Sequence, residues 1–150
     1  MPQSLSSVLV HTTFSTKNRE PFISPDIERE LFPYMATILQ TAQSPALIIG
    51  GTSDHVHLLF SLSRTKALAD VLADVKADSS KWIKGKGSQY AKFYWQTGYG
   101  AFSIGQSNVE ALRKYIVSQR EHHRKRTFQD EFRDLLAKYH VAYDERYVWD

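Results

Sequence analysis

The sequence predicts a single α+β domain in which helices back an antiparallel sheet. The prediction rests on an alternating segment near the amino terminus, a pair of short apolar runs joined by a tight turn, and helical patterns between such segments. At 150 residues the chain has the length of one compact domain, so residues 1–150 are taken as one unit. Cysteine is absent, which excludes disulfides, zinc–thiolate sites and thiol nucleophiles.

The first two elements are a strand and a capped helix. Residues 6–15 alternate between apolar and polar side chains, which predicts a strand. Ser24 and Pro25 then mark a helix start, because serine caps a helix and proline fits its first turn. Pro33 falls inside this helix and predicts a kink or an early break there.

A hairpin and a second helix follow. The apolar runs at residues 46–51 and 55–62 are joined by Thr-Ser-Asp, which predicts an antiparallel hairpin. The two glycines that end the first run predict a bulge or a close approach of another backbone. Residues 66–83 place their apolar side chains on one helical stripe, which predicts a helix that covers the sheet.

The last part of the chain predicts one more strand region and two helices. Residues 93–104 are aromatic and punctuated by glycine, as in a strand or a bent pair of strands. Ser107 and Glu110 have the spacing of a capping box and predict a helix from there to about Arg120. A final helix is predicted over residues 128–139. The resulting order, β-α-β-β-α-β-α, is typical of a ferredoxin-like sheet.

The charge distribution favours an anionic partner. The formal net charge is +3 and the pI is about 9.1, and basic residues concentrate in residues 113–126. A solvated helix face is one interpretation of that stretch. Together with an aromatic content of 13%, it also fits single-stranded nucleic acid. We find no apolar run long enough to cross a membrane and no secretion signal, so we expect a cytoplasmic protein.

Two histidines in the second hairpin strand are candidate metal ligands. Side chains at i and i+2 share one face of a strand, so His55 and His57 project together. Two imidazoles on one rigid face can share a divalent metal, but the same pattern also occurs in an ordinary half-buried strand. His11 is either a neighbour of this pair or a packed strand residue, and Asp54 is either a partner of a ligand histidine or a turn residue.

The predicted helix after residue 107 supplies a further pair. Tyr115 and Gln119 are four residues apart and therefore lie on one helix face, which Leu112 and Ile116 can anchor to the sheet. A glutamine oxygen suits a hard cation such as Mg or Mn, and a His, His, Gln set leaves positions open for a phosphate oxygen. The competing interpretation is a core tyrosine with a solvent-facing amide.

These residues resemble a known family. The run from Asp54 to Leu59 (DHVHLL) is similar to the His-hydrophobic-His (HUH) motif, and the run from Tyr115 to Gln119 (YIVSQ) is similar to the Tyr-x-x-x-Gln motif of single-tyrosine transposases of the insertion sequence two-hundred type. Residues 14–17 (FSTK) and 95–103 (WQTGYGAFS) also look like this family. The resemblance covers roughly residues 8–125.

The resemblance implies an HUH/Rep-like fold with a tyrosine-bearing helix near the carboxyl end. It implies a bacterial transposase that cleaves and rejoins single-stranded DNA through a 5′-phosphotyrosine at Tyr115. The divalent metal, Mg or Mn, would be held by His55, His57 and Gln119. It also implies recognition of hairpins at the element ends, and a homodimer with composite sites in which the tyrosine helix docks on the other subunit.

Basic residues near these motifs are candidate DNA contacts, with ordinary surface charge as the competing interpretation. They are Lys17, Arg19, Lys81, Lys84, Arg113 and Arg120. Trp82 and Trp95 are candidates for stacking on bases, although core packing is the other interpretation of both. A free phenol with a pKa near 10 costs roughly 4 kcal/mol to deprotonate at neutral pH, so Tyr115 needs a metal or a proton acceptor nearby.

Three other functions fit parts of the pattern. A domesticated binder of DNA or RNA hairpins would keep the fold but would not need His55, His57, Tyr115 and Gln119 together. A replication initiator or relaxase nickase of the HUH class usually has a longer chain and a third histidine in place of Gln119. An unrelated metal-dependent hydrolase would turn over without a covalent protein–DNA adduct.

Overall fold

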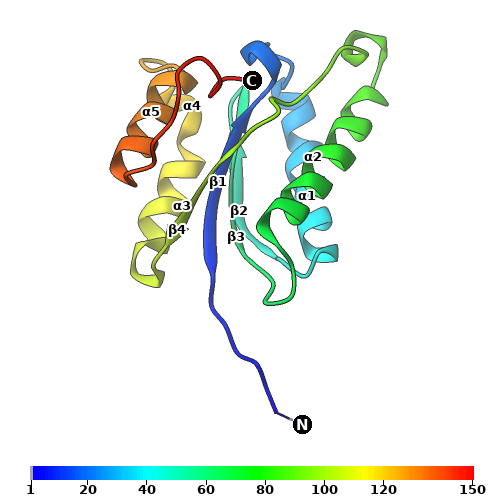
Figure 1. Cartoon of the computed structure of the whole chain (residues 1–150). Coiled ribbons are helices and arrows are strands. Elements are labelled where there is room, and N and C mark those ends of the chain that lie inside the picture. The colour runs from blue at the N-terminus through cyan, green and yellow to red at the C-terminus, as the bar shows by residue number, and fades with distance from the viewer. Residues whose placement is uncertain (1) are drawn as a thin grey trace.

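The structure, a computed structural model, describes residues 2–150 and contains one antiparallel sheet between two layers of helices (Figure 1). The strands are β1 (Leu9–Ser15), β2 (Ala46–Gly51), β3 (His55–Ser61) and β4 (Gly100–Ile104), in the order β2-β3-β1-β4. The helices are α1 (Pro25–Thr41), α2 (Leu68–Lys84), α3 (Val109–Val117), α4 (Gln119–His122) and α5 (Phe128–Lys138). The predicted helix-backed antiparallel sheet is confirmed. Within residues 2–150 we find no helix long and apolar enough to cross a membrane.

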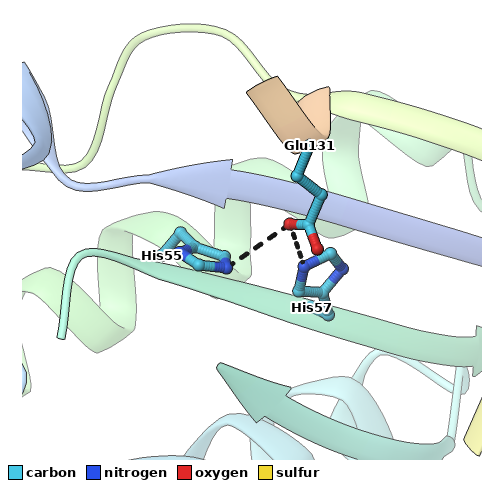
Figure 2. Close-up of side chains that lie close together, drawn as sticks. All are labelled: His55, His57 and Glu131. Atoms are coloured by element: carbon cyan, nitrogen blue, oxygen red, sulfur yellow. Dashed lines mark hydrogen bonds and ion pairs between the residues drawn. The ribbon is translucent and has the colours of Figure 1, made fainter. Parts of the chain in front are cut away.

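The two central strands, β1 and β3, send alternate side chains to opposite layers. One set, which includes Phe14, Val56 and Leu58, packs with α1 and α2 in the main core. The opposite face carries His55 and His57 beneath α3, α4 and α5 (Figures 1 and 2). Because helices cover both faces, every residue of β1 is buried, and polar side chains on the second face must find partners inside the protein.

Helix α1 begins as predicted but does not break at Pro33. The Ser24 hydroxyl accepts a hydrogen bond from the Ile27 amide (3.2 Å), and Pro25 occupies the first turn. The helix then continues for 17 residues, with Pro33 inside it. Pro33 and Arg29, whose carbonyl the proline leaves without its helical partner, are both exposed. Water can bond that carbonyl while the apolar face stays packed, so the predicted break was wrong.

The carboxyl-terminal half differs from prediction in three places. Of residues 93–104, only β4 is a strand, and a single bridge joins Trp95 to Thr16. Trp95 is buried and donates to the Ser79 hydroxyl (2.9 Å), so its ring is not available for stacking on a base. The Ser107 capping box is also wrong. Residues 106–108 form a 3₁₀ turn, and α3 starts one residue later than predicted, without a side-chain cap. The predicted helix to about Arg120 is also interrupted at Ser118, so that Gln119 begins the separate helix α4.

The tyrosine-bearing helix α3 lies very close to strand β2. A Cβ built on Gly50 would meet the Ile116 carbonyl oxygen at 2.6 Å and the Ile116 side chain at 2.7 Å. The glycine therefore permits the close backbone approach that its sequence context predicted, and the strand also carries a register shift near its start. This contact sets the height of α3, and with it Tyr115, above the sheet.

We expect Gly50→Ala to destabilise the fold by about 1–3 kcal/mol, because the added methyl group forces α3 away from β2. Urea denaturation measures this effect. Gly105→Ala is the matched control, since its backbone is extended and its nearest neighbour lies 3.8 Å from the added carbon. Equal stability of the two variants would contradict the proposed role of Gly50.

Candidate active site

The two histidines of β3 lie side by side at the buried face of the sheet (Figure 2). Both side chains are fully buried, and they face the layer formed by α3, α4 and α5. Thr13 and Ser15 lie opposite His57 and His55 on β1. The strand periodicity therefore places the two imidazoles as the sequence predicted.

Neighbouring polar groups orient each imidazole ring. The Nδ1 atom of His55 lies 2.7 Å from the Asp54 carboxylate and 3.0 Å from the Thr52 hydroxyl. The Nδ1 atom of His57 lies 2.8 Å from the Nε2 atom of His11. His11 and Asp54 therefore contact the histidine pair directly. These contacts leave the Nε2 atom of each β3 histidine directed into the site.

His11 and His57, whose rings contact one another, are held in the neutral form. Burial and the neighbouring His57 lower the pKa of His11 to about 3. Burial also lowers the pKa of His57, despite the opposing influence of Glu131. A neutral imidazole keeps a lone pair on one ring nitrogen, which is the form that binds a metal.

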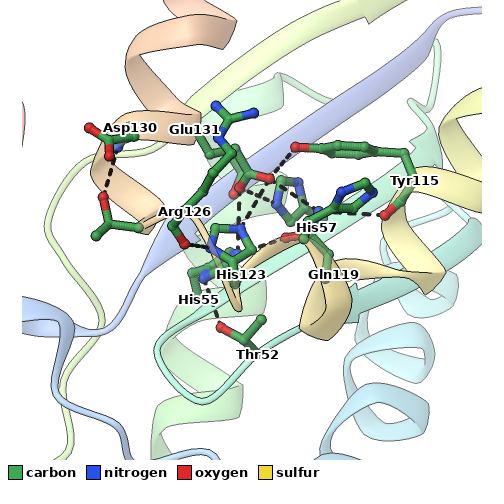
Figure 3. Close-up of polar contacts among 12 residues, drawn as sticks. Thr52, His55, His57, Tyr115, Gln119, His123, Arg126, Asp130 and Glu131 are labelled. Atoms are coloured by element: carbon green, nitrogen blue, oxygen red, sulfur yellow. Dashed lines mark hydrogen bonds and ion pairs between the residues drawn. The ribbon is translucent and has the colours of Figure 1, made fainter.

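A carboxylate from α5 completes the cluster. The Oε1 atom of Glu131 lies 2.8 Å from His57 Nε2 and 3.5 Å from His55 Nε2 (Figure 2). Its Oε2 atom lies 3.2 Å from His123 Nε2 and accepts a hydrogen bond from the Gln119 amide at 3.1 Å (Figure 3). Glu131 is 2% exposed, so its charge is shielded from bulk water and depends on the polar groups around it.

The cluster stabilises Glu131 as a carboxylate. Burial alone raises the pKa of the Glu131 carboxyl, but contacts with His123 and His57 outweigh burial and hold that pKa well below its usual range. For His123, burial lowers the pKa, but the nearby Glu131 charge outweighs burial and raises that pKa above the ordinary imidazole value. The negative charge of Glu131 therefore favours the protonated form of His123.

Sequence reasoning missed Glu131, although the sequence carries a signal for it. Glu131 lies three residues after Phe128 and four before Leu135, on the apolar face of α5. An acidic residue on the face that a helix packs against the core requires a buried partner. His123 lies within the basic stretch of residues 113–126, and nothing local in the sequence links it to His55.

Tyr115 and Gln119 reach this cluster from α3 and α4. The Tyr115 hydroxyl donates a hydrogen bond to Glu131 Oε2, and its ring lies edge-on to the His57 ring, with 5.9 Å between centroids (Figure 3). The Oε1 atom of Gln119 lies 2.9 Å from His55 Nε2. All four predicted site residues thus meet within one chain.

The Tyr115 phenol is held in its protonated form. Burial raises the pKa of Tyr115 above its ordinary value, and the negative charge and hydrogen bond of Glu131 add to this effect. Deprotonation in advance is therefore costlier than for a free phenol. The same carboxylate, however, is positioned to accept the proton.

The donor set fits a divalent cation. Ligand atoms of His55, His57 and Glu131 all lie within 4.8 Å of one another. His55 Nδ1 lies beside the Asp54 carboxylate, and His55 Nε2 lies 2.9 Å from Gln119 Oε1 and 3.5 Å from Glu131 Oε1. Several electron-pair donors that converge on one point need a proton or a cation between them. Two imidazoles with a carboxylate suit a divalent metal, and the predicted amide ligand lies at the same point.

The six predicted DNA contacts fall into three pairs. Arg113 donates to the Leu47 carbonyl (2.8 Å) and Arg120 pairs with Glu28, so each ties its helix to another element. Lys17 and Lys84 lie over the ring of Tyr94, at 5.9 and 4.0 Å from its centroid. Tyr94 is 52% exposed, which makes these two lysines and the ring a surface suited to nucleic acid.

The other two candidate contacts lie at element ends. Arg19 follows β1 and donates to the Trp149 carbonyl (3.4 Å) near the carboxyl terminus. Lys81 is exposed in the last turn of α2. Trp82, in the same turn, stacks on Tyr34 of α1, which agrees with core packing for that ring.

Comparisons with known proteins agree with this architecture. One similar solved structure, of a candidate transposase from Deinococcus radiodurans R1, has a TM-score of 0.62 and 16% identity, and the match covers 77% of this chain and 95% of that one. Another, a REP-associated tyrosine transposase bound to a REP hairpin, has a TM-score of 0.56 and 13% identity, with 77% and 68% covered.

At these identities the likeness shows the fold, which is that of HUH transposases. No curated protein sequence matches significantly. The family model of IS200-like transposases, however, matches residues 4–119, which is most of the chain and includes both sequence motifs. The chain therefore belongs to the IS200-like transposase family.

Proposed function

We propose that this transposase cleaves and rejoins single-stranded DNA through a 5′-phosphotyrosine at Tyr115. The observation that supports the proposal most strongly is the convergence of the Tyr115 hydroxyl, two histidine Nε2 atoms and the Glu131 carboxylate in one buried cluster. A pure binding protein has no need for this combination of a nucleophile and cation ligands.

The cation-holding residues are His55, His57 and Glu131, with the Gln119 carbonyl oxygen as a fourth donor. Asp54 and His11 orient the two rings from behind. When bound, a divalent cation such as Mg or Mn supplies positive charge that offsets the charge of the phosphate in the transition state.

Tyr115 carries the covalent step, and Glu131 accepts its proton. As the phenol oxygen bonds to phosphorus, its proton passes to Glu131 Oε2, and the bond between phosphorus and the 3′ oxygen breaks. The released 3′ oxygen takes up a proton to give a 3′-hydroxyl. In the reverse direction a 3′-hydroxyl attacks the phosphotyrosine, so cleavage and joining use the same residues.

The DNA partner is proposed to be a hairpin with a flanking single strand. One structural neighbour is described as bound to a REP hairpin, which supports this class of ligand. The exposed surface of Tyr94 with Lys17 and Lys84 offers a stacking ring between positive charges. Arg19, Lys81, Arg113 and Arg120 are the further candidates, and phosphate contacts of this kind weaken as salt increases.

The direct test is formation of a covalent adduct. The protein is incubated with end-labelled single-stranded DNA from the flanks of its own gene, with Mn²⁺ or Mg²⁺, and resolved on a denaturing gel. We expect an adduct that disappears when a chelator is added. Turnover without any adduct would instead support the hydrolase alternative.

The arrangement within one chain also predicts the outcome of mixing two inactive variants. Tyr115→Phe retains the histidines, and His57→Ala retains the tyrosine. A site built within each chain stays inactive in the mixture, because neither chain holds both groups. Recovery of about a quarter of the activity would instead indicate the composite homodimer that the family resemblance implies. Wild-type protein diluted with each variant separately is the control.

A further inference from the structure

A cavity of about 550 Å³ lies between β4, α3 and α5 and reaches the nucleophile. His11, Tyr115 and Glu131 line it, and because His11 and Glu131 are buried, they form its deep end. Its volume lies within the range of small-ligand sites. The inference drawn from this cavity rests on the proposed function of Tyr115.

The position of Tyr115 decides how DNA enters. A second hollow is lined by Asp54, Arg120 and His123, but Tyr115 does not line it. A phosphodiester that comes within bonding distance of the Tyr115 oxygen therefore approaches from the cavity between α3 and α5. The nucleotide attached to that phosphate is brought to the same cavity.

The walls of the cavity suit the faces of a base. Ile104, Leu112 and Leu135 contribute apolar side chains that are only partly buried by the protein itself. Tyr139 adds an aromatic ring, which is held by stacking on Phe102 at 4.8 Å between centroids. Enzymes that hold an unstacked base place apolar or aromatic side chains against its faces and polar groups at its edge.

The rim of the cavity supplies the polar groups. Asn108 lines it and immediately precedes α3, yet its side chain does not cap the helix, although asparagine is one of the strongest capping residues. Its amide therefore remains free to pair with a base edge, as asparagine does with adenine. Lys138 and Ser103, both exposed, line the same cavity.

We propose that this cavity is a nucleobase subsite that takes one unstacked base of the nucleotide adjoining the bond cleaved by Tyr115. Leu112 and Leu135 contact the faces of the base, and Asn108 contacts its edge. The protein then reads one position beside the cleavage site directly. A single amide contact of this kind gives a preference of roughly 10- to 100-fold among bases.

A randomised library of single-stranded DNA tests the subsite. Wild-type protein and variants are incubated with the library and Mn²⁺, and the DNA of covalent adducts is sequenced across the junction. We expect wild type to prefer one base at one position beside the junction by roughly tenfold or more. Asn108→Ala should lose that preference and keep the rest of the profile.

A second variant, Leu112→Trp, tests the subsite by filling the cavity with a larger side chain. Leu112→Trp should lower adduct yield at least tenfold, and an abasic nucleotide at the preferred position should restore it, because the space then needs no base. Val117→Trp is the matched control, since Val117 lies on the same helix and is 71% exposed. Circular dichroism verifies that each variant is folded.

These experiments distinguish failure of the proposed base subsite from failure of the proposed Tyr115 chemistry. Adducts with an unchanged profile in Asn108→Ala and unchanged yield in Leu112→Trp overturn the subsite and leave the nucleophile intact. If no adducts form with wild type, the proposed chemistry fails, and the cavity is tested by titrating deoxynucleoside monophosphates while the Tyr139 ring is followed by NMR. Shifts that Leu112→Trp abolishes support the subsite, and their absence in wild type overturns it.

Discussion

Tyr115→Phe is expected to eliminate the covalent protein–DNA adduct and to lower strand cleavage at least roughly 10⁴-fold, because the phenol oxygen is the proposed nucleophile. The substitution removes one oxygen and keeps the half-buried ring beside His57. Its cost to the free energy of unfolding should be about 1.5–3 kcal/mol, the usual net value of a hydrogen bond to a charged group. Denaturing gels measure the adduct, and urea denaturation measures the stability.

Tyr34→Phe is the matched control for this prediction. Tyr34 stacks on Trp82 in the layer of α1 and α2, on the other face of the sheet. The Tyr34→Phe variant should therefore cleave DNA at the wild-type rate. An adduct that persists in Tyr115→Phe means that another group is the nucleophile, and the assignment of Tyr115 then fails.

Glu131→Gln is expected to weaken binding of Mn²⁺ by at least roughly 100-fold and to abolish cleavage. The substitution preserves size but removes the negative charge that three histidines, a glutamine and the Tyr115 hydroxyl share. Electron paramagnetic resonance titration measures Mn²⁺ affinity without reference to activity. Glu121→Gln, at an exposed position of α4, should behave as wild type.

Gln119→Ala separates the two possible third ligands. If the carboxylate is the principal oxygen ligand, Gln119→Ala loses less Mn²⁺ affinity than Glu131→Gln, because a neutral amide oxygen attracts a cation more weakly. The opposite order would leave His55, His57 and Gln119 as the ligand set that the sequence predicts. Glu131 would then serve Tyr115 alone.

In metal-free protein, the stability difference between wild type and Glu131→Gln should depend on pH. The pKa of Glu131 is depressed in the folded state, so its stabilising contribution is present above about pH 4.5, the ordinary carboxyl value, and is lost as the pH falls below it. The difference in the free energy of unfolding between wild type and Glu131→Gln should therefore shrink from about pH 6 to about pH 3. Denaturation in the presence of a chelator measures it. A difference that is constant over this range would contradict the depressed pKa.

Several parts of the site were predictable because they depend on local periodicity. The two-residue repeat of a strand places His55 and His57 on one face. Tyr115 and Gln119 both reach the cluster, as their spacing predicted, although the predicted single helix is interrupted at Ser118 and Gln119 begins α4. The glycine pair of the hairpin predicted a close approach, which Gly50 makes to α3. Such features require no knowledge of how distant elements pack.

Local rules failed where tertiary packing competes with them. A helix tolerates Pro33 because the residue lies on the solvent face of α1. The predicted capping box at Ser107 does not form. A 3₁₀ turn occupies residues 106–108 instead, and α3 starts one residue later than predicted. In the aromatic stretch before β4, only one bridge forms, because Phe93 and Trp95 turn into the core against α2.

By itself, the sequence determined the class of fold, the family, and the shared faces of the two histidines and of the tyrosine with its glutamine. Only the tertiary structure decided that α5 folds back over β3 and inserts Glu131 between these groups. His57 and Glu131 are 74 residues apart, so no periodicity relates them. Their contact exists because the apolar face of α5 must be buried, and burying that face carries the carboxylate into the site with it.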